Sequence, residues 1–312
     1  MKIFIAGAGA MGSRFGFMLH QAGNEVSLID GWQDHINAII ENGLEVNYNG
    51  QEFNIQIPIY NQKDLDINSK AELIIVFTKA MQLDEMMKDL QPIISKETKI
   101  LCLLNGLGHE DVIDKYLPAE NIYLGNTVWT AGMTGPGKVK LFGTGALELQ
   151  NIVPGFEKEA NEIAEALSSA GLNAKYSDDI KFSVYQKACV NGTMNGLCTL
   201  LDGNMNEVGA TSTSKTMIWK IMEEFRAVAD FENINLDLDY IYDKILEFND
   251  INKLGNHYPS MYQDLIINHR KTEIDYINGA ISRKGTKYGI PTPYCDFLTD
   301  LIHAKEDLLD AK

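Results

Sequence analysis

The sequence predicts an α/β fold in which an amino-terminal doubly wound sheet is followed by an all-helical carboxy-terminal domain. An apolar strand at the amino terminus runs directly into a glycine-rich turn and a helix. Short buried strands then alternate with helical segments as far as Tyr176, which is typical of a sheet covered by helices on both faces. Beyond Ser177 only helical patterns remain.

Composition narrows the class of protein. With 312 residues, the chain is long enough for two domains that each bury a core. Its formal net charge of −16 argues against a nucleic-acid partner and against binding to an anionic membrane, since both require basic patches. No signal peptide is visible, and no apolar run approaches the roughly 20 residues of a membrane span, so we expect a cytoplasmic protein.

The cysteines do not follow the paired spacing of a zinc site. Their neighbours are apolar, so we expect reduced, buried thiols with neither a disulfide nor a metal. The four residues are Cys102, Cys189, Cys198 and Cys295.

The first strand, Lys2–Ala6, leads into the loop Gly7-Ala8-Gly9-Ala10-Met11-Gly12, which fits the pattern G-x-G-x-x-G. A helix follows and ends near Gly23, and a second strand, Glu25–Ile29, is closed by Asp30. In such a loop the first glycine permits a tight turn, the second lets the backbone approach a pyrophosphate, and the third lets helix and strand pack closely. The helix amino terminus offers unpaired N–H groups to the phosphates. We therefore predict a Rossmann-type, dinucleotide-binding unit.

Asp30 bears on the choice of cofactor. A carboxylate at this position binds the adenosine ribose hydroxyls and repels a 2′-phosphate, which favours NAD over NADP. No arginine follows it. His35 is either a phosphate contact or a scattered surface histidine.

Further strands continue the alternation, with a helix at Phe156–Ala170. Ligands of doubly wound sheets bind at the carboxyl ends of the strands, where Lys79 and Asn105 are placed. Each also has an ordinary interpretation: Lys79 could be a solvated loop lysine, and Asn105 could belong to an Asn-Gly turn. The predicted strands are Gln51–Tyr60 (one strand or a hairpin), Glu72–Thr78, Lys99–Leu104, Ile122–Trp129, Val139–Leu149 and Leu172–Tyr176.

The composition changes at Ser177-Asp178-Asp179, so we predict a dinucleotide-binding domain over 1–178 and a helical domain over 179–312. Asn204–Ser214 reads as a polar loop of small residues. The predicted helices are about 180–201, 213–232, 237–249, 260–283 and 293–309.

Within the helix at 180–201, Lys187, Asn191 and Asn195 fall four residues apart and share one face of an otherwise apolar segment. Burying a lysine and two amides is costly unless partners bind them. The stripe is therefore either solvated or lines a cleft in which the lysine works. Gly192 and Gly196 indicate close approach by a ligand or by a neighbouring helix.

Two later stretches are ambiguous from their residues alone. Ser260 precedes a helical segment, and either caps that helix or contributes to a site. Glu273 and Asp275 lie in a partly apolar helical pattern, where carboxylates are usually solvated or paired. Arg270 and Lys271 are close enough in sequence to pair with one of them.

Taken together, these residues resemble the ketopantoate reductase (2-dehydropantoate 2-reductase) family over nearly the whole chain. The markers occur in one order along the sequence, and the last is the most specific. They are the glycine loop, Thr78-Lys79, Leu104-Asn105-Gly106, Lys187-x-x-x-Asn191-x-x-x-Asn195, Ser260-Met261-x-Gln263-Asp264 and Thr272-Glu273-Ile274-Asp275-Tyr276-Ile277-Asn278-Gly279.

The resemblance implies roles for individual residues. Lys187 matches the general acid that protonates the ketone oxygen, and Glu273 matches a second essential acid that contacts the substrate. The groups that hold the hydroxyl and carboxylate of the substrate match Asn191, Asn195, Ser260 and Asn256. Lys79 and Asn105 match residues near the cofactor ribose and nicotinamide. The family also implies a homodimer and a step in pantothenate synthesis.

The function expected from this resemblance is NAD(P)H-dependent reduction of ketopantoate, a small anionic 2-keto acid, to pantoate. A cationic donor such as Lys187 suits the alkoxide that ketone reduction generates. Family members mostly use NADPH through a basic residue after the second strand, whereas Asp30 favours NADH here. The alternatives are a reductase of another branched 2-keto acid and a catalytically silent NAD(P)H sensor. A sensor needs neither Lys187 nor Glu273.

Overall fold

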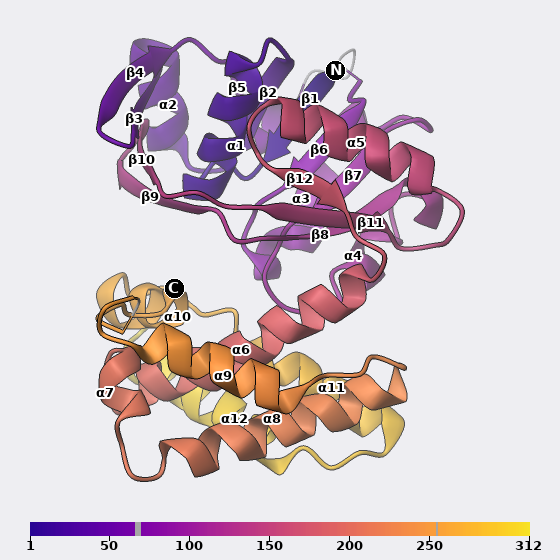
Figure 1. Ribbon diagram of the computed structural model, residues 1–312. Coiled ribbons are helices and arrows are strands. Elements are labelled where there is room, and N and C mark those ends of the chain that lie inside the picture. The colour runs from indigo at the N-terminus through magenta and orange to yellow at the C-terminus, as the bar shows by residue number, and fades with distance from the viewer. Residues whose placement is uncertain (66–69, 254) are drawn as a thin grey trace. The chain divides into compact units, whose positions relative to one another are not determined.

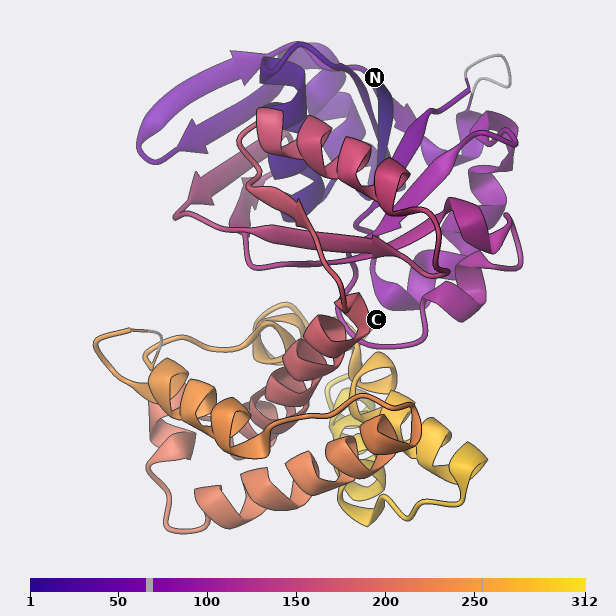
Figure 2. The ribbon, with the colours of Figure 1, turned by 45° about the vertical axis from the view of Figure 1, so that its right-hand side comes forward.

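The computed structural model describes residues 1–65, 70–253 and 255–312, which divide between two units (Figures 1 and 2). The amino-terminal unit comprises Met1–Leu104 and His109–Ile180. The helical unit comprises Lys181–Lys312 together with Asn105–Gly108, a short segment from the first half of the chain.

An eight-stranded sheet in the order β12-β11-β8-β7-β6-β1-β2-β5 forms the centre of the amino-terminal unit. From β8 to β5 all neighbours are parallel, while β11 runs antiparallel to β8 and parallel to β12. The strand order reverses direction at β1 and β6, which confirms the doubly wound sheet. The strands are β1 (Lys2–Ala6), β2 (Glu25–Asp30), β5 (Ile59–Asn61), β6 (Leu73–Val76), β7 (Lys99–Cys102), β8 (Ile122–Thr127), β11 (Leu147–Asn151) and β12 (Ala174–Tyr176).

Both faces of this sheet are covered. Ile3 and Ile5 of β1 share a core with α1 (Ala10–Gln21) and α5 (Glu157–Ser169), whereas Phe4, on the opposite face, is also buried. Since side chains alternate between the faces of a strand, burial of consecutive residues requires cover on both sides. In Figures 1 and 2, α5 lies across the β11–β12 side. The shorter helices are α2 (Gln33–Asn42), α3 (Leu83–Asp89) and α4 (Glu110–Ile113).

A second, four-stranded sheet was not predicted. Its order is β4-β3-β10-β9, and α1 contacts both this sheet and the main one. Arg14 of α1 is fully buried and donates from Nη1 to the Thr130 carbonyl at 2.6 Å. Its guanidinium lies 4.0 Å from the centre of the Trp129 ring. The Arg14 side chain therefore helps to hold the small sheet on α1. The strands are β3 (Leu44–Tyr48), β4 (Gln51–Ile55), β9 (Thr130–Gly135) and β10 (Lys138–Phe142).

Two strand predictions merged segments that the fold separates. Gln51–Tyr60 contains β4 and β5, and Val139–Leu149 contains β10 and β11, and in both cases the two strands belong to different sheets. The second break falls at Gly143, with φ of 73°, before Gly145, whose Cβ would lie 2.5 Å from Trp129. The glycines thus mark a change of sheet within one apolar stretch.

The helical unit forms around α6 (Ile180–Leu201), α8 (Ser214–Phe231), α9 (Leu238–Asn249), α11 (Asn278–Tyr288) and α12 (Pro293–Leu308). Gly192 and Gly196 of α6 admit other helices and not a ligand: a Cβ on Gly192 would lie 2.5 Å from the Phe225 ring, and one on Gly196 would lie 2.9 Å from Leu298. The predicted polar loop Asn204–Ser214 contains α7 (Met205–Gly209), which begins with a capping box formed by Asn204 and Glu207.

The predicted helix over 260–283 is wrong, because three short elements replace it. A single turn, α10 (Ser260–Tyr262), continues into a π-helical turn, η5 (Gln263–Ile267), and the chain then leaves the helix at His269, with φ of 49°. A 3-10 turn, η6 (Ile274–Tyr276), precedes α11. Glu273 and Asp275 therefore lie outside any long helix.

The four cysteines are free and buried, as predicted, and burial raises the pKa of each thiol. Among the residues in ranges 1–65, 70–253 and 255–312, no helix is both long and apolar enough to cross a membrane. The same ranges contain no group of His, Cys, Asp or Glu side chains suited to a metal ion.

Candidate active site

The glycine loop joins β1 to α1, and its three glycines are needed for different structural reasons. Gly7 has φ of 94°, and a Cβ there would lie 2.5 Å from the backbone of Thr78. A Cβ on Gly12 would lie 1.9 Å from the Gly7 carbonyl oxygen. A Cβ on Gly9, by contrast, would meet no heavy atom within 4 Å. Packing of the protein explains the first and third glycines, and the second leaves room for a group that approaches the loop.

The loop also leaves the helix start open. Gly9 is the N-cap of α1, and no side chain caps this end. Ala10 and Met11 begin the helix, so the N–H groups of the first turn are positioned as in a dinucleotide phosphate site. These features fit the pyrophosphate of a dinucleotide.

Asp30 ends β2 beside this loop. Its Oδ2 accepts a hydrogen bond from the Ala8 N–H at 2.6 Å, and its Oδ1 accepts one from the Trp32 N–H at 2.8 Å. The carboxylate is partly exposed. Each carboxylate oxygen has two lone pairs, so the group retains the capacity to accept from ribose hydroxyls.

His35 is not a surface residue, and that alternative is wrong. The ring is fully buried and stacks on Trp32. Nδ1 accepts from the Gly137 N–H at 2.9 Å, which leaves Nε2 to donate to the Ala8 carbonyl at 3.0 Å. Burial lowers the pKa of His35 despite the nearby Asp30 charge, so the neutral ring supports the loop from behind.

Lys79 follows β6, the neighbour of β1, at the carboxyl edge of the sheet. Its backbone begins a short 3-10 turn, η2 (Ala80–Gln82), and its side chain is partly buried. The sheet topology thus places Lys79 at the same edge as the glycine loop.

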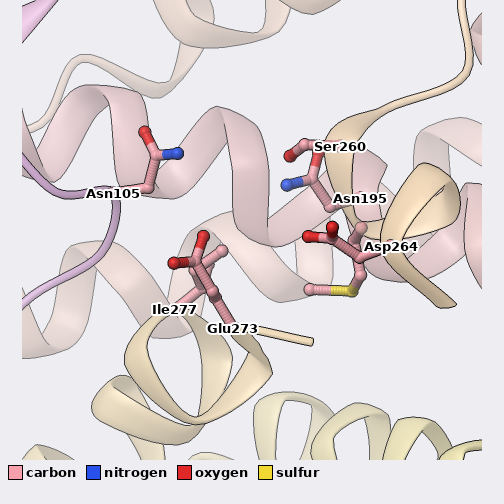
Figure 3. Close-up of a pocket in the computed structure, with 7 residues that line it drawn as sticks. Asn105, Asn195, Ser260, Asp264, Glu273 and Ile277 are labelled. Carbon is pink, nitrogen blue, oxygen red and sulfur yellow. The ribbon is translucent and has the colours of Figure 1, made fainter. Parts of the chain in front are cut away.

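A small polar pocket lies within the helical unit (Figure 3). It combines side chains from α6, from α10 and η5, from the segment before α11, and from the Asn105–Gly108 segment. In Figure 3, Asn195, Ser260 and Asp264 group together, and Asn105 and Glu273 face them across the pocket. The lining residues are Asn105, Asn195, Ser260, Met261, Asp264, Glu273 and Ile277.

Asn105 reaches this pocket because its segment is anchored to the helical unit. The Leu107 N–H donates to the Tyr276 carbonyl at 2.8 Å, and the Leu107 side chain joins the helical core. Gly106 has φ of 98°, and a Cβ there would lie 2.3 Å from the Tyr276 oxygen. The Asn-Gly turn is therefore a docking segment as well as a turn.

Lys187 is coupled electrostatically to the pocket without lining it. Burial lowers the pKa of Lys187 to about 8, and the negative charge of Glu273 opposes that shift. On the same face of α6, Asn195 is 6% exposed and lines the pocket, whereas Asn191 is partly buried and does not. A fully solvated stripe is thus excluded. Asn256 is exposed and also lies outside the pocket lining.

Asp264 is a pocket residue that sequence reasoning did not assign to the site. Its side chain is 7% exposed and accepts from Arg270 Nη2 at 2.7 Å, so Arg270 pairs with this acid. The available signal was the spacing from Ser260, since residues four apart share a helix face. Ser260 itself is not a helix cap: Pro259 occupies the N-cap position, and no side-chain cap bond forms.

The comparisons with known proteins agree along the whole chain. A family model described as ketopantoate reductase PanE/ApbA matches residues 3–154, and the model of its C-terminal domain matches residues 179–306. The chain belongs to the ketopantoate reductase family. Members of this family are NAD(P)H-dependent oxidoreductases that act on a keto acid.

Two curated relatives of this ketopantoate reductase family are similar from end to end. The 2-dehydropantoate 2-reductase of Lactococcus lactis subsp. lactis is 59% identical over 312 residues, covering 100% of both chains. That of Streptococcus pyogenes serotype M1 is 49% identical over 310 residues, covering 99% of both. A solved structure of D-mandelate dehydrogenase with NADH and anilino(oxo)acetate is 60% identical, with a TM-score of 0.97 and full coverage of both chains.

Proposed function

We propose that this member of the ketopantoate reductase family reduces ketopantoate to pantoate, the step expected in pantothenate synthesis. The observation that carries the proposal is the electrostatic coupling of Lys187, a lysine of lowered pKa, to Glu273, an acid that lines a small polar pocket. Bound nicotinamide supplies the hydride. Lys187 donates a proton to the ketone oxygen, and its positive charge stabilises the alkoxide as it forms.

The substrate is an anion, and the chain carries a net charge of −16, so local donors must hold it. Lys187 supplies a cation, and the amides of Asn195 and Asn191 supply neutral donors. Ser260, at the start of α10, offers a hydroxyl without being used as a cap. Asn256 is proposed as a further contact on the family resemblance. Glu273 contacts the substrate and raises the pKa of Lys187, which keeps more of the general acid protonated.

The proposed cofactor is NADH. The loop Gly7–Gly12 receives the pyrophosphate, and Asp30 binds the adenosine ribose while repelling a 2′-phosphate. Lys79 and Asn105 are proposed to contact the ribose and the nicotinamide. The D-mandelate dehydrogenase structures contain NADH, which agrees with this preference. We also propose, from the family resemblance, that the protein is a cytoplasmic homodimer.

A second candidate is reduction of another 2-keto acid, branched or aromatic at the carbon next to the carbonyl. The 60% identity to a D-mandelate dehydrogenase favours it specifically. The same chemistry serves both candidates, since each requires a hydride, a proton and recognition of a carboxylate. The pocket wall that would distinguish them contains Met261 and Ile277, and the flexible side chain of Met261 can adapt to different substituents. The proposed work of Lys187 and Glu273 argues against a silent sensor.

The test follows oxidation of NADH and of NADPH with ketopantoate, with branched 2-keto acids and with phenylglyoxylate, the keto acid of mandelate. We expect ketopantoate to be reduced with the highest kcat/KM, and NADH to be preferred. Reduction of the other keto acids without turnover of ketopantoate would replace the first candidate with the second. A higher kcat/KM for NADPH than for NADH would refute the role assigned to Asp30.

A further inference from the structure

The backbone that carries Glu273 is irregular. The chain leaves η5 through His269, and Glu273, with φ of −93° and ψ of 23°, begins the short turn η6. A residue in a long helix is held by the hydrogen bonds of successive turns. Glu273 does not benefit from such a helix, so its position depends on the contacts of the residues beside it.

Two of these neighbours are tied to α12. The Thr272 N–H donates to Glu306 Oε1 at 2.7 Å, and this contact is buried. Asp275 Oδ1 lies 3.0 Å from His303 Nε2, on the other side of Glu273. His303 Nδ1 lies 3.0 Å from Glu306 Oε2, so one imidazole joins both carboxylates. The Glu306 side chain is only 6% exposed.

The bridge has a protonation requirement. Ionised carboxylates only accept hydrogen bonds, so both ring nitrogens of His303 must donate, and only the imidazolium can do this. Burial alone would lower the pKa of His303, but its hydrogen bonds to Asp275 and Glu306 outweigh that effect and raise it. As the pH rises through this pKa, one of the two bonds is lost.

Other charged groups around the bridge form separate contacts. Arg283 of α11 donates to the Asp275 backbone carbonyl at 2.7 Å, which leaves the Asp275–His303 contact intact. Lys305 of α12 donates to the Thr199 carbonyl of α6 at 2.6 Å. The Lys312 backbone pairs with His269 and Lys271. The positive charges of Arg283 and His303 thus flank Asp275 from α11 and α12.

We propose that His303 is a positioning residue: its protonated ring fastens the segment Thr272–Asp275 to α12 and so holds the Glu273 carboxylate in the pocket. The bridge rests on contacts within the helical unit alone. Its effect on catalysis rests on the proposed function, since Glu273 must contact the substrate for its position to matter. The bridge is complete at low pH and loosens as the pH rises.

The first test needs no substrate. The imidazole of His303 is titrated by NMR in the full-length protein and in Asp275→Asn. We expect a pKa above the ordinary value in the wild type and a lower one in the variant. In parallel, hydrogen exchange over residues 269–277 should show protection that falls as His303 deprotonates, after correction for the intrinsic pH dependence of exchange. An ordinary pKa for His303, or protection that is independent of its titration, would overturn the proposal.

The second test compares His303→Gln with His20→Gln, a control at the far end of α1. At low pH, His303→Gln should lower protection over residues 269–277 and raise KM for ketopantoate about three- to fivefold, with kcat nearly unchanged, since partly exposed ion pairs are weak. Wild type and variant should converge at high pH. If KM stays equal at low pH in an active enzyme, His303 does not position Glu273. If the wild type does not turn over ketopantoate, the proposed function fails, while NMR and exchange still decide the bridge.

Discussion

Asp30 and Ala8 are joined by a 2.6 Å hydrogen bond from the Ala8 N–H to Asp30 Oδ2. The contact ties the end of β2 to the glycine loop at the place where the pyrophosphate is proposed to bind. The carboxylate proposed to select the cofactor therefore also shapes the loop that receives it. Changes at Asp30 should affect affinity and selectivity together.

Asp30→Asn tests this double role. An amide keeps one acceptor oxygen, so one of the two backbone bonds is lost, as is the charge that repels a 2′-phosphate. We expect KM for NADH to rise about tenfold, the scale of one lost bond to a charged group, and the preference for NADH over NADPH to shrink. Steady-state kinetics with both cofactors measures this. Glu25→Gln, exposed at the start of the same strand, is the control, and an equal change in both variants would contradict the prediction.

Gly9→Ala separates ligand binding from folding. The added methyl group meets no protein atom within 4 Å, so the melting temperature should match that of the wild type. It would, however, occupy the side of the loop that a pyrophosphate approaches, so binding of NADH should weaken markedly in a fluorescence titration. Gly132→Ala, where a Cβ also meets nothing within 4 Å, should change neither quantity. Normal NADH affinity in Gly9→Ala would exclude close contact at this loop.

Lys187→Ala should lower kcat by about 10²- to 10⁴-fold, the usual contribution of a positioned general acid. Single-turnover oxidation of NADH at saturating ketopantoate measures the step directly. Lys181→Ala, an exposed lysine at the start of the same helix, should retain full activity. A large rise in KM with kcat changed only a few-fold would make Lys187 a binding residue instead.

The pH dependence of kcat follows from the same lysine. A general acid works when protonated, so with a pKa lowered to about 8, kcat should decline as the pH rises past that value. Glu273→Gln removes the charge that raises this pKa, so the decline should move to lower pH. A pH–rate profile of both proteins checks the shift, with Glu162→Gln, at an exposed position of α5, as the control. A profile that moves to higher pH, or not at all, would show that Glu273 does not act on Lys187.

The sequence predicted correctly those parts of the fold that depend on interactions between residues close together in the chain. The glycine loop, the first two strands and the bounds of α6 are all set by periodicity and by turns, and the structure confirms them. The split of Val139–Leu149 between two sheets was not predictable in this way, since both halves are apolar and only tertiary pairing separates them. The interruption of the helix over 260–283 likewise depends on distant partners, including the Arg270–Asp264 contact and the pairing of Lys271 with Lys312.

The candidate site shows the same division. Asn195, Ser260, Glu273 and Asn105 line one pocket, and spacing together with family resemblance had singled them out. Asp264 was missed because its local signal, the four-residue spacing from Ser260, does not distinguish a pocket acid from a solvated one. His35 was misjudged because its burial depends on Gly137, more than 100 positions away in sequence.

The Asn105–Gly108 segment has a consequence for how this protein can be divided. A fragment starting after Ile180 would contain the helices α6 to α12, yet it would lack Asn105, which lines the pocket. It would also lack Leu107, whose side chain is part of the helical core. In a chimaera that joins the first half of one relative to the second half of another, the Asn105–Gly108 segment would come from a different protein than the helices it packs against. The two halves are therefore not interchangeable modules, and Gly106 should remain glycine whichever side chain occupies position 276, since a Cβ there would meet the backbone carbonyl of that residue.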